Sequence, residues 1–128
     1  MTIENCPCGS TLTYSQCCEL FHNETNIALT AENLMRSRYC AYVLKNAEYL
    51  LSTWYKSTRP EHLDISQDNV VWQKLEIVHT KKGSAKDDKG RVEFNVFYIQ
   101  DGEIQVMHEI SRFKKVAGRW FYVDGVVE

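Results

Sequence analysis

The chain has 128 residues and a mass of 14.9 kDa, the size of one domain with room for a small appendage. Hydrophobic residues make up 44%, charged residues 25% and aromatic residues 12%, which excludes a disordered or low-complexity chain. Fifteen basic against seventeen acidic residues leave a formal charge of −2, so the overall charge recruits neither nucleic acid nor an anionic membrane.

The sequence indicates a cytoplasmic protein that does not enter a membrane. No stretch approaches the ~20 apolar residues of a membrane helix, and the N-terminal segment MTIEN lacks the basic and then apolar pattern of a signal peptide. In a reducing compartment, the five cysteines are more typical of thiols or metal ligands than of disulfides.

From residue 30 to about residue 61, the sequence has the features of helices. Over residues 30–46 the apolar side chains recur at helical intervals, with Thr30 as the N-cap. A second, shorter helix is expected from Asn46 through about Tyr55. The segment 58–61 predicts the start of a third helix, because Pro60 suits the first helical position and an acidic residue suits the first turn.

After about residue 68 the apolar period changes from that of helices to that of strands. Four segments are rich in β-branched and aromatic residues, namely 69–79, 90–99, 103–115 and 118–126. The short connections at Asp101-Gly102 and Ala117-Gly118 predict hairpins, and therefore an antiparallel meander. Helices followed by strands predict an α+β domain, in which helices pack on one face of a curved antiparallel sheet.

Four of the five cysteines lie close together near the N-terminus: Cys6, Cys8, Cys17 and Cys18. This clustering predicts a small N-terminal module over residues 1–22, followed by the body over residues 30–128. Four thiolates at this spacing can close a tetrahedral zinc site, with Gly9 allowing the turn that the backbone needs and Ser10 holding it. A closed shell of this kind is structural, so we expect one structural zinc ion that orders a segment too poor in apolar residues to fold alone.

Other interpretations of the cysteine cluster stay open. Disulfides would need an oxidising compartment, and a bridge between the adjacent Cys17 and Cys18 would distort its peptide. A redox dithiol usually has a C-x-x-C spacing, which is absent, and an iron–sulfur cluster usually spaces its cysteines further apart. A zinc site in which His22 replaces one of the adjacent cysteines is compatible with the sequence.

The segment CPCGSTLTYSQCC resembles the SEC-C zinc motif, named for the tail of the SecA translocation ATPase. Further along, LMRSRYCAYV, the Trp54 region, HEISRF and RWFYVDG resemble the YchJ family of uncharacterised bacterial proteins, so that the resemblance covers most of the chain. It implies a nuclear transport factor 2-like (cystatin-like) fold, a cone of helices against a strongly bent sheet. It also implies that the zinc ligands are Cys6, Cys8, Cys17 and Cys18.

Two departures limit what this resemblance implies. Many SEC-C motifs carry lysines before the last cysteines, whereas residues 11–16 here are uncharged, so the SecB chaperone that docks on the SecA tail does not carry over as a partner. Many YchJ relatives carry a second motif at the C-terminus, whereas this sequence ends in VVE, and we expect no second zinc ion. Folds of this type often pair through the outer sheet face, which implies a homodimer.

Arg38 is a candidate for a pocket inside the body. It falls between Leu34 and Tyr42 on the apolar stripe of the first helix, where a guanidinium needs a carboxylate, a ligand anion or carbonyl groups. The simpler account is an ion pair with an internal acid such as Glu109, or a side chain that extends past the helix edge.

The densest cluster of polar residues on the predicted strands lies on either side of residue 110. Strict alternation places His108 and Arg112 on one face of the strand, and Glu109 and Ser111 on the other. His108 and Glu109 therefore cannot act as one dyad unless a bulge intervenes. The aromatic residues, Trp54 among them, are more simply the core of the cone than a ligand site.

Cys40 lies alone in the first helix and is expected to be a small buried apolar residue rather than a nucleophile. The sequence contains no Gly-rich phosphate loop, no G-x-S-x-G elbow and no H-E-x-x-H pattern. The residue pattern therefore leans away from an enzyme.

These patterns favour a zinc-stabilised protein-interaction or adaptor module, because a closed four-thiolate shell has no open position at which to activate water. A protein partner would bind the zinc motif, and chelation would unfold residues 1–22 while the body keeps its secondary structure. The alternative is a small-molecule-binding protein or enzyme that uses the interior of the cone, with Arg38, His108 and Glu109 as polar groups. An open cavity of roughly a few hundred Å³ on which two or more of them converge would favour it. Nucleic-acid binding is not expected, because the motif has no Lys or Arg between Cys6 and Cys18.

Overall fold

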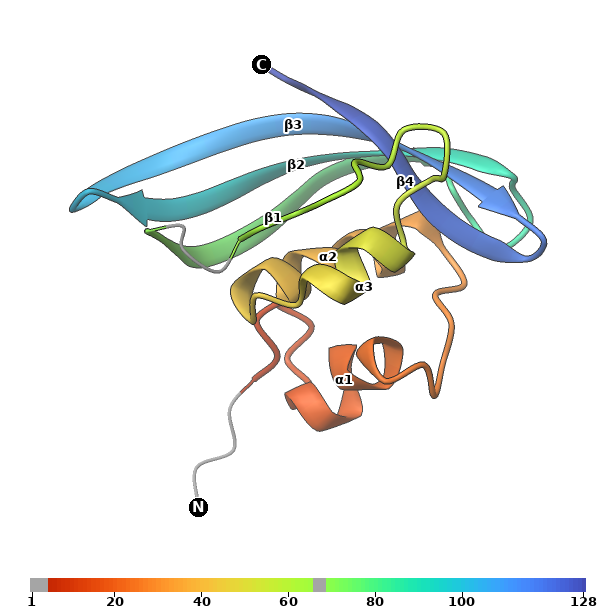
Figure 1. Ribbon diagram of the computed structural model, residues 1–128, viewed down its shortest axis with the longest axis horizontal. Coiled ribbons are helices and arrows are strands. Elements are labelled where there is room, and N and C mark those ends of the chain that lie inside the picture. Colours follow the sequence, from red (N-terminus) through yellow and green to blue (C-terminus); the bar gives the residue numbers. More distant parts are fainter. Residues whose placement is uncertain (1–4, 66–68) are drawn as a thin grey trace.

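The computed structural model describes residues 5–65 and 69–128. Within these ranges one antiparallel sheet contains, in spatial order, β1 (Val70–Lys82), β2 (Lys89–Gln100), β3 (Glu103–Val116) and β4 (Arg119–Val127). Helices α2 (Ala31–Val43) and α3 (Ala47–Ser52) cover one face of the sheet, and the short helices η1 (Tyr14–Gln16) and α1 (Cys18–His22) lie beyond α2 (Figure 1). The predicted α+β architecture is confirmed. None of the described helices is long and apolar enough to cross a membrane.

The two predicted hairpins are tight two-residue turns. Asp101 and Gly102 have φ angles of 53° and 79°, and Ala117 and Gly118 have φ angles of 52° and 81°. Positive φ at both central positions is typical of the type I′ turn, whose twist matches that of paired strands. The meander from β2 to β4 is therefore fixed by local turn chemistry.

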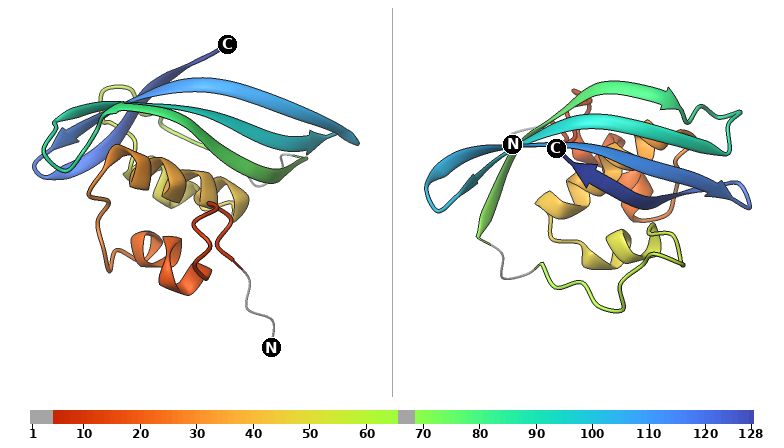
Figure 2. Two further views of the ribbon diagram at one scale, coloured as in Figure 1. Left: turned by 180° about the vertical axis from the view of Figure 1, so that it is seen from behind. Right: turned by 90° about the horizontal axis from the view of Figure 1, so that it is seen from above.

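Strand β1 is long and irregular. It continues to Lys82, past the predicted end at His79, and its pairing with β2 shifts register between Trp72 and Lys74 and again between Ile77 and His79. Such bulges bend a strand and increase its twist. The sheet consequently curves over the helices, as the two views in Figure 2 show.

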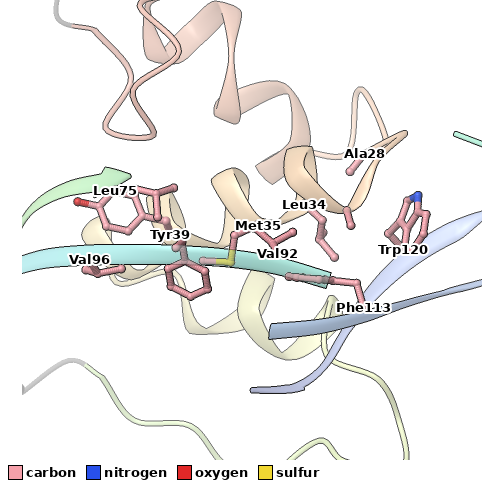
Figure 3. Packing of buried hydrophobic residues seen from close by; sticks show 11 residues of the cluster. Ala28, Leu34, Met35, Tyr39, Leu75, Val92, Val96, Phe113 and Trp120 are labelled. Atoms are coloured by element: carbon pink, nitrogen blue, oxygen red, sulfur yellow. The ribbon is translucent and has the colours of Figure 1, made fainter. Parts of the chain in front are cut away.

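Helix α2 is buried on two sides. Its start is capped as predicted, since the Thr30 hydroxyl accepts a hydrogen bond from the Asn33 backbone N–H at 3.1 Å. One side packs against the sheet through Leu34, Met35 and Tyr39, which meet strand side chains in the main core (Figure 3). The strand residues of this core are Leu75, Val92, Phe94, Val96, Phe113 and Trp120. The other side of α2 lies against the N-terminal segment, so the molecule has three layers (Figure 2).

The prediction that a third helix starts at residues 58–61 is wrong. Residues 56–58 form a turn, and the chain then runs without helix to residue 65. The backbone is bound to the edge of β4 instead: the Tyr55 N–H donates to the carbonyl of Tyr122 at 2.7 Å, and the Thr58 hydroxyl donates to the carbonyl of Val123 at 2.7 Å. The start signal at Pro60 was not followed by an apolar helical stripe, and the edge strand supplied the hydrogen-bond partners.

Two glycines allow the link between β1 and β2 to approach α2. The Ala31 N–H donates to the carbonyl of Gly83 at 2.9 Å, and Gly83 has a φ of 81°. A Cβ on Gly90 would lie 2.5 Å from the Cα of Gly83, which is closer than real Cβ atoms come to other atoms. A side chain at position 90 would therefore push the sheet away from the first turn of α2.

We expect Gly90→Ala to lower the free energy of unfolding by about 2–3 kcal/mol, because the backbone of Gly83 cannot move without disturbing its bond to Ala31. Urea unfolding followed by circular dichroism measures the loss. Gly102→Ala is the matched control: its φ is 79°, but nothing lies within 4 Å of the added Cβ. It should cost about 1 kcal/mol through the backbone alone. Equal losses in the two variants would contradict close packing at Gly90.

Candidate functional site

The N-terminal segment folds into a loop that gathers four thiols. The Cys6 N–H donates to the carbonyl of Leu12 at 2.7 Å, and this closes a turn at Gly9, whose φ is 86°. The short helix η1 then leads to Cys17, and α1 begins at the next residue. As a result, the Sγ atoms of Cys6, Cys8, Cys17 and Cys18 all lie within 4.8 Å of one another.

The spacing of these sulfur atoms fits a tetrahedral metal ion. The Sγ of Cys17 lies 3.6 Å from that of Cys8 and 4.0 Å from that of Cys18. Thiolates bound at about 2.3 Å in a tetrahedron are separated by about 3.8 Å. Cys6, Cys8 and Cys18 are also buried, so these sulfurs face one another rather than solvent. The predicted cluster is therefore compatible with binding one metal ion.

The surroundings of the thiols shift their pKa values in opposite directions. Hydrogen bonds from the side chains of Cys18 and Ser10 lower the pKa of Cys8 to about 4, although burial opposes them. Burial raises the pKa of Cys6 to about 12, and the hydrogen bonds that Cys18 makes to Cys40 and Cys8 raise its own pKa. The surroundings therefore favour the thiolate form of Cys8, and a bound cation would favour the thiolate form of the other ligands as well.

His22 already has partners for both ring nitrogens. Its Nε2 lies 2.8 Å from the carbonyl oxygen of Ser37, and its Nδ1 lies 2.8 Å from the hydroxyl of Tyr14. A carbonyl only accepts, so Nε2 carries the proton and Tyr14 donates to Nδ1. Burial lowers the pKa of His22, which agrees with a neutral ring. This geometry favours four cysteine ligands over a set in which His22 replaces one of them.

Cys40 is a fifth thiol beside the cluster. It is fully buried, as expected, but its Sγ lies 3.8 Å from the Sγ of Cys6. The spacing along the chain gave no sign of this contact. Helical spacing could have indicated it, because Arg36, Ser37 and Cys40 share the side of α2 that lies opposite its apolar stripe and thus faces away from the sheet. All five cysteines are free thiols in the structure, which does not support the disulfide interpretation.

Polar contacts fasten the four-cysteine loop to α2. The Arg36 guanidinium donates to the carbonyl of Cys8 at 2.6 Å and pairs with Glu32 at 3.0 Å. The Sγ of Cys18 lies 3.8 Å from the carbonyl of Arg36, one residue before the carbonyl that His22 binds. The candidate metal centre is therefore built against the helix that carries the core of the body.

A cavity of about 210 Å³ lies on the other side of α2, under the sheet. Its apolar wall is formed by Met35, Tyr39, Trp72, Phe94, Val96 and Met107. Its polar groups are Arg38, Tyr42, Glu109, Ser111 and Tyr122. Three of the predicted pocket residues, namely Arg38, Glu109 and Ser111, therefore converge on one cavity.

The buried Arg38 side chain contacts a carbonyl group, a hydroxyl group and two aromatic rings. Its Nη1 donates to the carbonyl of Leu50 at 2.7 Å and to the hydroxyl of Thr53 at 2.6 Å. Its guanidinium carbon lies 4.6 Å from the ring centroid of Tyr122 and 5.2 Å from that of Trp54. Burial lowers the pKa of Arg38 to about 10, which leaves the group charged at neutral pH. Among the described residues it forms no ion pair, so the simpler account of a pair with Glu109 is wrong.

Glu109 projects into the same cavity from β3. Its Oε2 accepts a hydrogen bond from the Ser111 hydroxyl at 2.5 Å. The neighbouring strand makes room for the carboxylate, because a Cβ on Gly125 would collide with it. The predicted alternation along β3 is confirmed, since Glu109 and Ser111 face the helices.

The remaining pocket candidates lie elsewhere. The Nε2 of His108 lies 2.7 Å from Glu93 on the outer face of the sheet. Arg112 pairs there with Asp124 at 2.6 Å. Trp54 lies against Arg38 but does not line the cavity, and its Nε1 is buried without a hydrogen-bond partner among the described residues. The cavity instead recruits Tyr42 and Tyr122, which the sequence did not single out as polar groups of a pocket.

Two family models and several bacterial proteins match this chain. A family model described as "YchJ, middle NTF2-like domain" matches residues 30–125, and one described as "SEC-C motif" matches residues 4–20. A UPF0225 protein from Streptomyces coelicolor is 48% identical over 120 residues, covering 94% of this chain and 93% of the relative. Another from Corynebacterium glutamicum is 42% identical over 127 residues, covering 98% of each chain.

Two solved structures have the same fold. The solution structure of a SEC-C motif containing protein from Rhodopseudomonas palustris superimposes with a TM-score of 0.84 at 33% identity, covering 96% of this chain and 98% of that one. The crystal structure of a SEC-C motif containing protein from Psychrobacter arcticus gives a TM-score of 0.80 at 29% identity, covering 98% and 84%. The nuclear transport factor 2-like fold expected from the sequence is confirmed.

We expect Cys8→Ala to abolish metal binding and Cys40→Ala to retain one metal ion per chain, because Cys8 belongs to the group of four sulfurs and Cys40 lies beside it. Elemental analysis of the purified variants, with titration of their thiols, measures the metal content. If Cys40→Ala also lost the metal while remaining folded, the ligand set of four would be contradicted.

Proposed function

Because the chain belongs to the YchJ family of SEC-C motif proteins, we propose that one structural zinc ion binds Cys6, Cys8, Cys17 and Cys18, and that the cone behind it binds a small molecule. Four thiolates form a soft, tetrahedral donor set, which suits Zn²⁺. The distance of 4.8 Å that contains all four sulfurs leaves room between them for a single ion. Zinc bound to four cysteines has no open coordination position, and its contribution here is to hold the loop against α2.

Removal of zinc should disorder residues 5–22 and lower the thermal stability of the body without unfolding it. The body keeps its own core between α2 and the sheet, but Ser37 and Cys40 lose the loop that covers them. We expect a decrease in Tm of about 5–10 °C, corresponding to about 1–2 kcal/mol. Circular dichroism and amide exchange, with and without a chelator, measure both effects.

Cys8→Ala is the matched control for chelation. Its circular dichroism spectrum and Tm should resemble those of the chelated protein and should not respond to the chelator. Loss of the β-sheet signal on chelation would contradict the separation of loop and body.

The small-molecule proposal rests on one observation: two opposite charges share an apolar cavity without pairing. Arg38 and Glu109 both line it, and neither forms an ion pair within the described residues. Arg38 keeps only neutral acceptors and Glu109 only a hydroxyl donor, so a ligand that offers each of them a further hydrogen bond or an opposite charge would bind favourably. Tolerated charges of this kind are typical of binding sites.

The shape of the cavity limits the ligand. At about 210 Å³ it is smaller than the roughly 300–1,000 Å³ of drug-sized pockets. The rings of Trp72 and Tyr42 lie beside it with centroids 5.8 Å apart. We infer a small planar molecule with an acceptor toward Arg38 and a donor toward Glu109. His108, one of the polar groups expected for the cone, faces outward with Glu93, so the activity we propose is binding.

An NMR titration with benzamide, benzoate and benzamidine tests this inference, because the three probes share a ring and differ in charge and hydrogen bonding. We expect benzamide, which both accepts and donates, to shift the indole signal of Trp72 most strongly. Glu109→Gln should weaken its binding about tenfold, the loss of one hydrogen bond to a charged group.

Glu93→Gln is the matched control, since Glu93 lies on the outer face of the same sheet. It should leave benzamide binding unchanged. If none of the three probes shifted Trp72 at millimolar concentration, or if the two variants weakened binding equally, the cavity would not be the site.

A protein partner that docks on the zinc motif is the second function we propose. Leu12 at the outer end of the motif is 50% exposed, and Leu29 in the segment that joins it to the body is 62% exposed. Both side chains are therefore accessible to a partner. Affinity capture with wild type and Leu12→Ser, each with and without zinc, tests this role. Both roles are proposed for the cytoplasm, where thiols stay reduced.

A further inference from the structure

A second depression of about 480 Å³ lies at the end of the sheet where β1 and β3 finish and β2 begins. Six of its lining residues are cationic, namely Lys81, Lys82, Lys89, Arg91, Arg112 and Lys114. The described residues that line it include no acid. We call this depression the basic cleft. Its charge contrasts with the formal charge of −2 of the whole chain.

The pairing of the strands brings these cations into direct opposition. Lys81 lies opposite Arg91, Arg91 lies opposite Arg112, and Lys89 lies opposite Lys114. Like charges directly opposite each other on paired strands are destabilising. Because Asp124 offsets the charge of Arg112, two uncompensated pairs remain at one place, Lys81–Arg91 and Lys89–Lys114, and an anion bound there would offset both.

Only part of this charge is balanced within the protein. The Arg112 guanidinium makes a two-fold hydrogen bond with the carboxylate of Asp124, which neutralises it. The Lys114 ammonium lies 5.1 Å from the ring centroid of Tyr55. Among the described residues, Lys81, Lys89 and Arg91 form no ion pair. Arg91 thus lies between Lys81, which has no carboxylate partner either, and Arg112, whose charge Asp124 balances.

We propose that the basic cleft binds a small anion that carries two phosphate groups. Its volume falls within the range of roughly 300–1,000 Å³ that holds small ligands. Guanidinium and ammonium groups bind phosphate oxygens through short, charge-assisted hydrogen bonds. Two rows of cations, one through Arg91 and one through Lys89, provide for two phosphates.

This site is independent of the proposed cavity. Arg91 and Arg112 alternate along their strands with Val92 and Ser111, which face the helices, so the two cations point to the outer face. Either site can therefore bind its ligand when the other is lost.

Calorimetric titration of the zinc-loaded full chain with fructose 1,6-bisphosphate tests the proposal. Fructose 6-phosphate, with a single phosphate, should bind at least about tenfold more weakly, because it loses the charged contacts of one row. The bisphosphate should also raise Tm, by an amount that grows with the logarithm of one plus its concentration over Kd, whereas sodium chloride at equal ionic strength should not.

Three variants distinguish a specific phosphate site from non-specific attraction of anions to a cationic surface. Arg91→Gln should weaken bisphosphate binding at least about tenfold while Tm of the free protein stays equal or rises, since the like-charge pair of Arg91 with Lys81 is relieved. Arg91→Lys keeps the charge and should retain most of the binding. Lys74→Gln is the matched control, because Lys74 lies on β1 outside the cleft, beside Glu76 at 4.0 Å.

Equal weakening by Arg91→Gln and Lys74→Gln would overturn the proposal, as would equal affinity for the bisphosphate and the monophosphate. A lower Tm of free Arg91→Gln would contradict the repulsion argument. Binding of a short single-stranded RNA that depends on Arg91, without binding of the bisphosphate, would identify a nucleic-acid surface in place of the proposed site.

Discussion

Helix α2 presents different chemistry to the layers on its two sides, and both layers depend on it. Toward the sheet it buries Leu34, Met35 and Tyr39, and each fully buried side chain of this size contributes about 1.5–3 kcal/mol. Toward the N-terminal loop it presents Arg36, Ser37 and Cys40, whose polar atoms bind the loop. A helix with one solvent-facing side could not fasten the thiol cluster to the core in this way.

The same helix connects the candidate metal centre with the interior cavity. Arg38 follows directly after the carbonyl that His22 binds, and its side chain turns toward the strands. The acceptors of its Nη1 come from the end of α3, so the positions of two helices fix the guanidinium. A disturbance of the thiol loop would therefore reach the cavity through one turn of helix rather than through the sheet.

Features with a local cause could be predicted from the sequence. The Thr30 cap, the type I′ turns at Asp101 and Ala117, and the alternation of Glu109 with His108 each depend on residues that are neighbours in the chain. The four-cysteine group also has short spacing, and its loop closes through positive φ at Gly9 and Thr11, two residues apart.

Features that depend on distant segments could not be predicted. Cys40 meets Cys6 only because α2 packs on the loop, and Arg38 finds carbonyl groups only because α3 ends beside it. The helix signal at Pro60 was overridden by the free edge of β4, which lies far along the chain. The basic cleft was hidden for a similar reason, since the net charge averages over the chain whereas strand register places Arg91 between two cations.

The irregular register of β1 has a consequence for the behaviour of the protein in solution. On the edge of β4, the backbone of Tyr122 is bound to Thr53 and Tyr55, whereas β1 ends the sheet on the other side with thirteen residues in one strand. A long straight edge of this kind would template the addition of strands from other molecules. The two bulges, together with exposed lysines at the end of the strand, interrupt that template, so the curvature of the cone also guards against aggregation.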